Sequence, residues 1–200
     1  MAPRFLISGY YGFGNLGDEA LLGVIVERLG TRYPGAAIDV LSNDPAATAR
    51  TYGVEATPRA APAAVRRAIE RAEVVLSGGG GLFQNVTSLR SLLYYAGIMR
   101  AAVRAEKKTM IFAQSIGPLD FWGRAAVRRL CRGVDRATVR DERSLELLAE
   151  LLPATPVERT ADPVFLFDPA SRPLDLAAEG LAGGDGAPLI VVSVRRWQNA

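Results

Sequence analysis

Short apolar runs alternate along the chain with longer segments in which apolar residues recur every three or four positions. The runs predict buried strands at 5–7, 37–41, 73–77, 109–113, 137–139 and 189–194. The periodic segments predict helices at 20–29, 46–52, 61–71, 89–106, 121–133 and 144–152. Regular alternation of strands and helices is typical of a doubly wound parallel sheet with right-handed crossovers. The predicted fold class is therefore α/β and Rossmann-like.

The end of the pattern predicts a domain boundary. Residues 173–186 are rich in Gly, Ala and Asp, as in a linker, and a new apolar run begins at Leu189. We expect a first domain over 1–170, a linker over 171–187 and the start of a second domain over 188–200. Because a strand needs neighbouring strands to be stable, the sequence predicts the first half of a two-domain protein.

Composition excludes several kinds of site. The 200 residues are 49% hydrophobic and 22% charged, which is typical of a globular domain. They include one cysteine and no histidine, so they offer no internal disulfide, no histidine triad and no metal site of the usual Cys or His type. No basic leader and no run of about 18 apolar residues is present, so the predicted location is the cytoplasm.

The net charge of +3 reflects clusters of arginine. The largest cluster has Arg124, Arg128, Arg129 and Arg132 at helical spacing. Two interpretations remain open: a solvated helix face, or peripheral contact with an anionic membrane at its inner face. No nucleic-acid-binding motif accompanies the arginines, so nucleic acid is not an expected partner.

A glycine-rich turn joins the first strand to the first helix. Gly12, Gly14 and Gly17 have G-x-G-x-x-G spacing, which can bring backbone amides close to a phosphate at a helix start. Asn15 and Asp18, however, crowd the place of a pyrophosphate, and the Lys of a P-loop is missing. Helix capping by the acidic residues and a plain tight turn therefore remain as alternatives.

Polar or glycine-rich turns follow four more strands, and in an open parallel sheet they would share one edge, where ligands bind. They span 78–84, 114–118, 140–144 and 161–163. Four consecutive glycines could form an amide nest for an anion or allow close packing. Arg140 could clamp a carboxylate or phosphate, or pair with Asp141 or Glu142. Asp162 could contact a ligand or cap its turn.

Together these motifs resemble the polysaccharide pyruvyl transferase family. Most similar are the bacterial enzymes that modify the secondary cell-wall polymer on which S-layer proteins are anchored. The resemblance covers essentially the whole chain. It rests on GYYGFGNLGDE at 9–19, GGGGLFQ at 78–84, QSIGP at 114–118, VRDERS at 139–144 and the Asp162-Pro163 pair. It implies a glycosyltransferase-like enzyme of the two-domain GT-B type, with the active site between the halves.

The resemblance also implies a reaction. Phosphoenolpyruvate would donate a pyruvate ketal to N-acetylmannosamine of a lipid-linked saccharide, releasing phosphate and needing no cofactor. The chemistry requires a base for the attacking hydroxyls, a proton for the enol methylene and cations for the donor's anionic groups. We expect Asp18 to be the base and Arg140 the main anion clamp, with Arg195 as a second clamp.

The remaining predicted substrate-binding residues lie in the same turns: Gly12, Gly14, Asn15, Gly79, Gly80, Gln84, Gln114, Ser115 and Asp162. The family's general acid is a histidine in the second half, which nothing here matches, so we expect residues 1–200 to fold without catalysing the reaction. The alternatives are a GT-B glycosyltransferase or a sugar- or nucleotide-binding domain. A dinucleotide oxidoreductase would need Asp39 at a strand tip.

Overall fold

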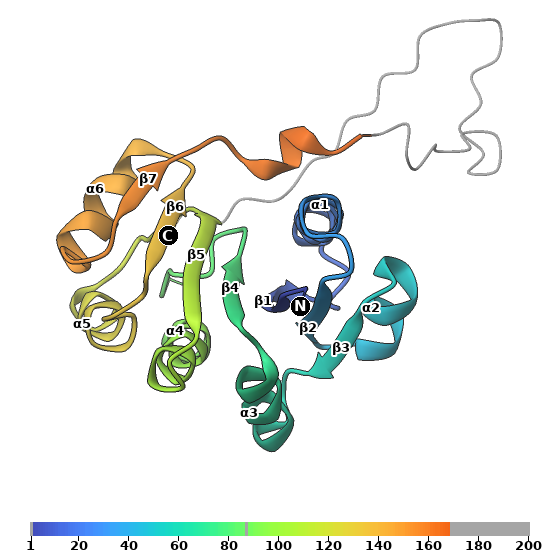
Figure 1. The fold of residues 1–200 in the computed structure, drawn as a ribbon. Coiled ribbons are helices and arrows are strands. Elements are labelled where there is room, and N and C mark those ends of the chain that lie inside the picture. Colours follow the sequence, from blue (N-terminus) through green and yellow to red (C-terminus); the bar gives the residue numbers. More distant parts are fainter. Residues whose placement is uncertain (1, 87, 169–200) are drawn as a thin grey trace, which may run out of the picture. The chain divides into compact units, whose positions relative to one another are not determined.

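A computed structural model describes residues 2–86 and 88–168, and within them seven strands form one parallel sheet in the order β3-β2-β1-β4-β5-β6-β7 (Figure 1). The strands are β1 (Arg4–Tyr11), β2 (Ala37–Ser42), β3 (Glu55–Pro58), β4 (Val74–Gly78), β5 (Lys108–Gln114), β6 (Arg136–Val139) and β7 (Val157–Arg159). The helices are α1 (Leu16–Arg32), α2 (Pro45–Tyr52), α3 (Pro62–Arg71), α4 (Leu89–Arg104), α5 (Phe121–Leu130) and α6 (Glu142–Leu151), followed by a 3₁₀ turn, η1 (Pro163–Leu166). The predicted α/β doubly wound sheet is confirmed.

The strand order reverses between β1 and β4. From β1 the chain runs outward through β2 to β3, and α3 then returns it to the far side of β1. Figure 1 shows α1 on one side of the sheet and α3 and α4 on the other, as right-handed crossovers require. In such sheets the ligand site lies outside the carboxyl ends of the strands at the reversal.

Side chains of β1 alternate between two parts of the core. Leu6 packs with Met99 and other residues of the α3–α6 layer, whereas Phe5 and Ile7 pack with Leu22 of α1. All five are buried, and burying a large apolar side chain contributes about 1.5–3 kcal/mol. The central strand is therefore fixed from both faces, and its carboxyl end offers a rigid support for the turns that follow.

Two short strands, β3 and β7, are not among the elements predicted from sequence. Both lie at the outer edges of the sheet and pair with a single neighbour. Edge strands are often short and polar, so they show little hydrophobic pattern. The first helix also begins earlier than predicted, at Leu16, because the Asn15 side chain accepts hydrogen bonds from the first-turn amides.

The compact unit formed by the described residues ends at Phe167. The predicted linker at 171–187, the predicted strand at 189–194 and Arg195 lie outside the described residues. The division into two domains therefore remains a prediction.

The single cysteine, Cys131, lies in the core just after α5. It is completely buried, and this burial raises the pKa of its thiol to about 12. The thiol therefore stays protonated at neutral pH and packs as a small apolar group.

Candidate functional site

The turn between β1 and α1 is held in place by its own chain. Gly12 has φ of 75°, and a Cβ there would lie 2.2 Å from Ser42 Oγ, so only glycine fits. Gly14 also has a positive φ, 71°, but faces open space. Asn15 Oδ1 accepts hydrogen bonds from the amides of Gly17 at 3.1 Å and Asp18 at 3.3 Å. These contacts fix Asp18 on the first turn of α1.

The adjacent carboxylates of Asp18 and Glu19 have different surroundings. Glu19 accepts hydrogen bonds from the Gly12 amide at 2.8 Å and from the Tyr52 hydroxyl at 2.9 Å, so it stabilises the turn. The Asp18 carboxylate makes no hydrogen bond within residues 2–86 and 88–168 and lies against Gly80, where a Cβ would be 2.8 Å from Oδ1. Asp18 is therefore the carboxylate that remains free for chemistry.

Electrostatics set Asp18 apart from an ordinary surface carboxylate. Burial raises the pKa of its carboxyl group to about 6, with a further increase from Glu19 and an opposing effect of Arg140. A group with this pKa is mostly ionised at pH 7 and can still take up a proton, as a general base requires.

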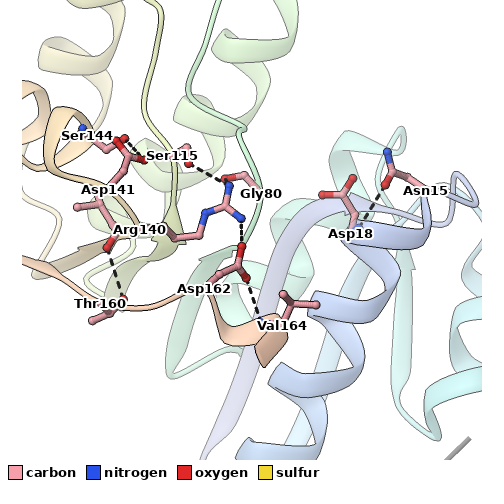
Figure 2. Close-up of polar contacts among 11 residues, drawn as sticks. Asn15, Asp18, Gly80, Ser115, Arg140, Asp141, Ser144, Thr160, Asp162 and Val164 are labelled. Atoms are coloured by element: carbon pink, nitrogen blue, oxygen red, sulfur yellow. Dashed lines mark hydrogen bonds and ion pairs between the residues drawn. The ribbon is translucent and has the colours of Figure 1, made fainter. Parts of the chain in front are cut away.

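Arg140 joins the ends of several strands (Figure 2). Its guanidinium forms an ion pair with Asp162 and donates hydrogen bonds to the Gly80 carbonyl at 3.2 Å and to Ser115 Oγ at 3.0 Å. Both members of the ion pair are largely buried, with side chains 21% and 24% exposed. The turns after β4, β5, β6 and β7 therefore meet at one guanidinium.

The alternative partners of Arg140 are engaged elsewhere. Asp141 caps α6, accepting hydrogen bonds from the Ser144 amide and hydroxyl at 2.8 Å each, and Glu142 pairs with Arg159 at 3.0 Å. Asp162 also caps η1 by accepting the Val164 amide at 3.0 Å. The capping alternative for Asp162 is thereby borne out, whereas its contact with substrate stays a prediction and its ion pair with Arg140 had no signal in the sequence.

Gln114 is the last residue of β5, and its side chain is directed into the sheet toward β4. It is completely buried, and its side-chain amide donates to the Ser77 carbonyl at 2.9 Å and to Ser77 Oγ at 2.8 Å. The preceding Ala113 has φ of 48°, at a register shift between β5 and β6. Two buried oxygens here have no hydrogen-bond partner among the described residues: Oε1 of Gln114 and Oγ of Ser8 in β1. In this conformation Gln114 supports the site from below.

The predicted site residues fall into distinct groups. Asp18, Gly80, Ser115, Arg140 and Asp162 come together at the reversal of strand order. The others lie around them: Gly12, Gly14 and Asn15 shape the first turn, Gly79 packs against Leu21, partly buried Gln84 follows the glycine run, and Gln114 lies below.

Asp39, required by the dinucleotide alternative, is buried inside β2. It accepts a hydrogen bond from Thr57 at 3.0 Å and pairs with Arg71 at 3.3 Å. Its carboxylate is therefore bound internally and away from the tip of the strand, where a ribose would need it.

Arg59 is a residue at this edge that the sequence reasoning missed. It directly follows β3, and its amide donates to the Ser42 carbonyl at the end of β2 at 2.9 Å. Arg59 was missed because β3 was not predicted. With β3 known, Arg59 stands at the carboxyl end of a strand, as the predicted site residues do.

The fold and this convergence of polar groups define an α/β protein with a candidate ligand site at the carboxyl edge of its sheet. Residues 15–196 match the family described as polysaccharide pyruvyl transferase, and the chain belongs to that family. The recognition of this family from the sequence motifs is thereby confirmed. A comparison with curated proteins finds no match.

Two solved structures found by comparison differ strongly from this chain in sequence. A ribokinase-like superfamily protein from Enterococcus faecalis V583 is 11% identical, with a TM-score of 0.46 over 74% of this chain and 48% of its own. An AraC family transcriptional regulator from Pseudomonas putida is 14% identical, with a TM-score of 0.42 over 90% of this chain and 97% of its own. This chain thus spans about half the length of the first of them.

The described part of the chain lacks two further kinds of feature. Among residues 2–86 and 88–168, no helix combines the length and the apolar character needed to cross a bilayer. The same residues contain no group of three or more Cys, His, Asp or Glu side chains placed to hold a metal ion.

Proposed function

We propose that this chain contributes one side of an active site that transfers pyruvate from phosphoenolpyruvate to N-acetylmannosamine of a lipid-linked cell-wall saccharide. The observation that carries the proposal is the half-buried Asp18 carboxylate, with its pKa near 6, which lies against Gly80 and within electrostatic reach of Arg140. Family membership supports pyruvyl transfer to a polysaccharide in general. The donor, the sugar and the S-layer-anchoring polymer are our proposals.

The proposed reaction balances without a redox cofactor. Two sugar hydroxyl oxygens form bonds to C2 of phosphoenolpyruvate, and the bond from C2 to the phosphate oxygen breaks. One hydroxyl proton is balanced by the proton gained at the methylene, which becomes a methyl group, and the other by the proton gained by phosphate. The protein must accept a proton from oxygen, deliver one to carbon and stabilise the cationic centre and the anionic groups.

In this scheme Asp18 accepts the proton of an attacking hydroxyl, since its carboxylate has no competing hydrogen bond within the described residues and is largely ionised at pH 7. Arg140 supplies positive charge at the same edge and holds Ser115 and the Gly80 carbonyl in fixed positions. The chain has no histidine, so the general acid implied for the family is not among its 200 residues. We therefore propose that these residues alone are inactive and that a second GT-B-like half completes the site.

The test uses the full-length protein with phosphoenolpyruvate and a lipid-linked N-acetylmannosamine disaccharide. We expect phosphate release together with a sugar product whose mass includes one pyruvate ketal, detected by mass spectrometry. No ketal with any mannosamine acceptor, combined with tight binding of a nucleotide sugar, would favour the GT-B glycosyltransferase alternative. A control reaction without acceptor identifies phosphate released by simple hydrolysis.

The lipid-linked acceptor gives the arginine cluster a proposed role in membrane contact from the cytoplasmic side. A groove of about 940 Å³ between α4 and α5 is lined by Arg100, Arg104, Arg124, Arg128, Arg129 and Arg132, together with Phe121, Ala125 and Leu130. At the start of α5, Phe121 and Trp122 are 74% and 67% exposed. Arginines beside exposed aromatic rings are typical of surfaces that bind anionic lipid headgroups.

Membrane contact predicts that the double variant Arg128→Gln/Arg129→Gln floats less with vesicles containing phosphatidylglycerol. Each Arg contributes about 1 kcal/mol at such a surface, so binding should weaken about 30-fold. The matched control is Arg50→Gln/Arg67→Gln, which removes the same charge from exposed positions on α2 and α3. Equal loss in both variants, or none in either, would favour the solvated-face interpretation.

A further inference from the structure

Arg59 lies in a cluster of aromatic side chains at the carboxyl edge of the sheet. Its guanidinium carbon is 4.5 Å from the ring centre of Tyr94, 5.0 Å from that of Phe13 and 5.3 Å from that of Tyr95. These rings come from the β1–α1 turn and from α4. A guanidinium among three rings is held by cation–π attraction and is partly removed from water.

The hydrogen bonds of Arg59 fix its position without neutralising its charge. One guanidinium nitrogen donates to the Tyr95 hydroxyl at 3.2 Å and to the Gly9 carbonyl at 3.4 Å, while the Tyr94 hydroxyl donates to the Arg59 carbonyl at 3.1 Å. Within residues 2–86 and 88–168, no carboxylate forms an ion pair with Arg59. Arg140, by contrast, already has Asp162. Arg59 is thus a preorganised cation that has no anionic partner in the described part of the chain.

Arg59 belongs to the same edge as Asp18. Tyr95 connects the two: its hydroxyl accepts from Arg59, and its pKa, raised mainly by burial, is raised further by Asp18 and lowered by Arg59. Arg140 approaches this edge from β6, whereas Arg59 approaches it from β3. The two cations therefore come from strands on opposite sides of the reversal of strand order.

An aromatic surface lies next to Arg59. Tyr10 and Phe13 are stacked, with ring centres 4.1 Å apart and planes at 9°, yet they remain 39% and 41% exposed. Exposed aromatic rings are costly in water and are common where a ligand covers them. The C–H face of a pyranose packs well on such rings, whose negative faces attract polarised hydrogens.

We propose that Arg59, Phe13 and Tyr10 form a subsite for a sugar bearing a phosphate ester, with the phosphate on Arg59 and the sugar ring on the aromatic pair. The inference rests on the proposed function, and it takes the link between the lipid and the acceptor saccharide to be a diphosphate. Two phosphate groups are then candidates for Arg59: this diphosphate and the phosphate of phosphoenolpyruvate. The aromatic pair assigns the subsite to the acceptor, because phosphoenolpyruvate has no ring to stack. Arg59 then binds the acceptor while Arg140 faces the donor.

Calorimetric titration of the full-length protein tests this assignment with three probes: a lipid-free disaccharide diphosphate, inorganic pyrophosphate and phosphoenolpyruvate. We expect Arg59→Gln to weaken both diphosphates about tenfold or more, as for loss of a charged hydrogen bond. Arg59→Lys should restore part of this affinity, and phosphoenolpyruvate binding should change less than about twofold in either variant. The matched control is Arg67→Gln, an exposed arginine on α3.

A second variant separates the sugar from the phosphate. Tyr10→Leu removes a ring that stacks on Phe13 and is not among the three rings around Arg59. It should weaken binding of the disaccharide diphosphate several-fold and leave binding of pyrophosphate unchanged, and it still tests the subsite if thermal unfolding shows that Arg59→Gln does not fold. Weaker binding of phosphoenolpyruvate alone, or unchanged binding of both diphosphates, would overturn the assignment. The subsite and the proposed reaction can fail separately. If the variants lose binding of the disaccharide diphosphate but the full-length protein forms no ketal, the subsite stands and the proposed reaction is rejected.

Discussion

Replacing Asp18 by asparagine is expected to lower kcat/KM for ketal formation by a factor of about 10²–10⁴, the usual contribution of a general base. The amide keeps the shape of the carboxylate against Gly80 but cannot take a proton from a hydroxyl. The enzyme with Asp18 should lose activity as the pH falls through about 6, where this carboxyl group becomes protonated. A pH–rate profile of both proteins checks this expectation.

The same substitution should stabilise the fold. The pKa of about 6 in the folded state lies above the ordinary value of 3.8 for an aspartate, so between these pH values the folded protein binds a proton more readily than the unfolded chain. Stability therefore decreases as the pH rises from about 4 to about 6, and the penalty of the charged form remains at pH 8. Allowing for solvent screening, Asp18→Asn should raise the free energy of unfolding at pH 8 by about 1 kcal/mol.

Glu19→Gln provides the control for Asp18→Asn. It removes the neighbouring charge that raises the Asp18 pKa. The loss of activity on the acidic side of the pH–rate profile should therefore move to lower pH, while activity at higher pH remains. It also weakens the contacts to Gly12 and Tyr52, so stability should decrease. An Asp18→Asn enzyme with normal activity, or a wild-type profile without a limb near pH 6, would contradict the role assigned to Asp18.

Arg140→Met is expected to lower the free energy of unfolding by about 2–3 kcal/mol, because the largely buried Asp162 carboxylate would lose its partner. The variant should also lose most of its activity, since a cation and the fixed positions of Ser115 and Gly80 disappear together. Chemical denaturation and the ketal assay measure the two effects. Arg143→Met, an exposed arginine on α6, should change stability by less than about 0.5 kcal/mol.

A double variant separates the structural from the catalytic role of Arg140. Adding Asp162→Asn to Arg140→Met removes the unpaired charge, so part of the lost stability should return. Activity should remain low, because the positive charge is still missing. If activity instead returns together with stability, Arg140 acts only by holding the turns in place, and its proposed role toward the substrate is wrong.

The sequence predicted the central part of this fold because that part carries the strongest patterns. β1, β2, β4 and β5 are buried apolar strands, and the helices between them show clear 3.6-residue periodicity. Edge strands β3 and β7 are polar and three or four residues long, so no local pattern distinguishes them from loops. Missing β3 also concealed Arg59, whose partners are 36 and 50 residues away.

The polar residues of the site were found because they follow predicted strands, but their partners were not. Nearness along the chain favours Asp141 and Glu142 as partners of Arg140, whereas Arg140 pairs with Asp162, 22 residues further on. Such pairing depends on how the turns after β6 and β7 meet, which spacing along the chain does not encode. Likewise, Gln114 is polar and follows a strand, and only the backbone at Ala113 shows that it points inward.

The buried thiol of Cys131 has a practical consequence for following this protein in solution. Because its sulfur is inaccessible and protonated, reagents that label thiols should leave the native chain unmodified. A cysteine introduced at Leu16, which is 84% exposed beside Asn15, would then carry a fluorophore at a single defined position. Stopped-flow fluorescence could then follow the binding of phosphoenolpyruvate and of the saccharide acceptor in separate experiments, and no native residue would have to be removed from the core.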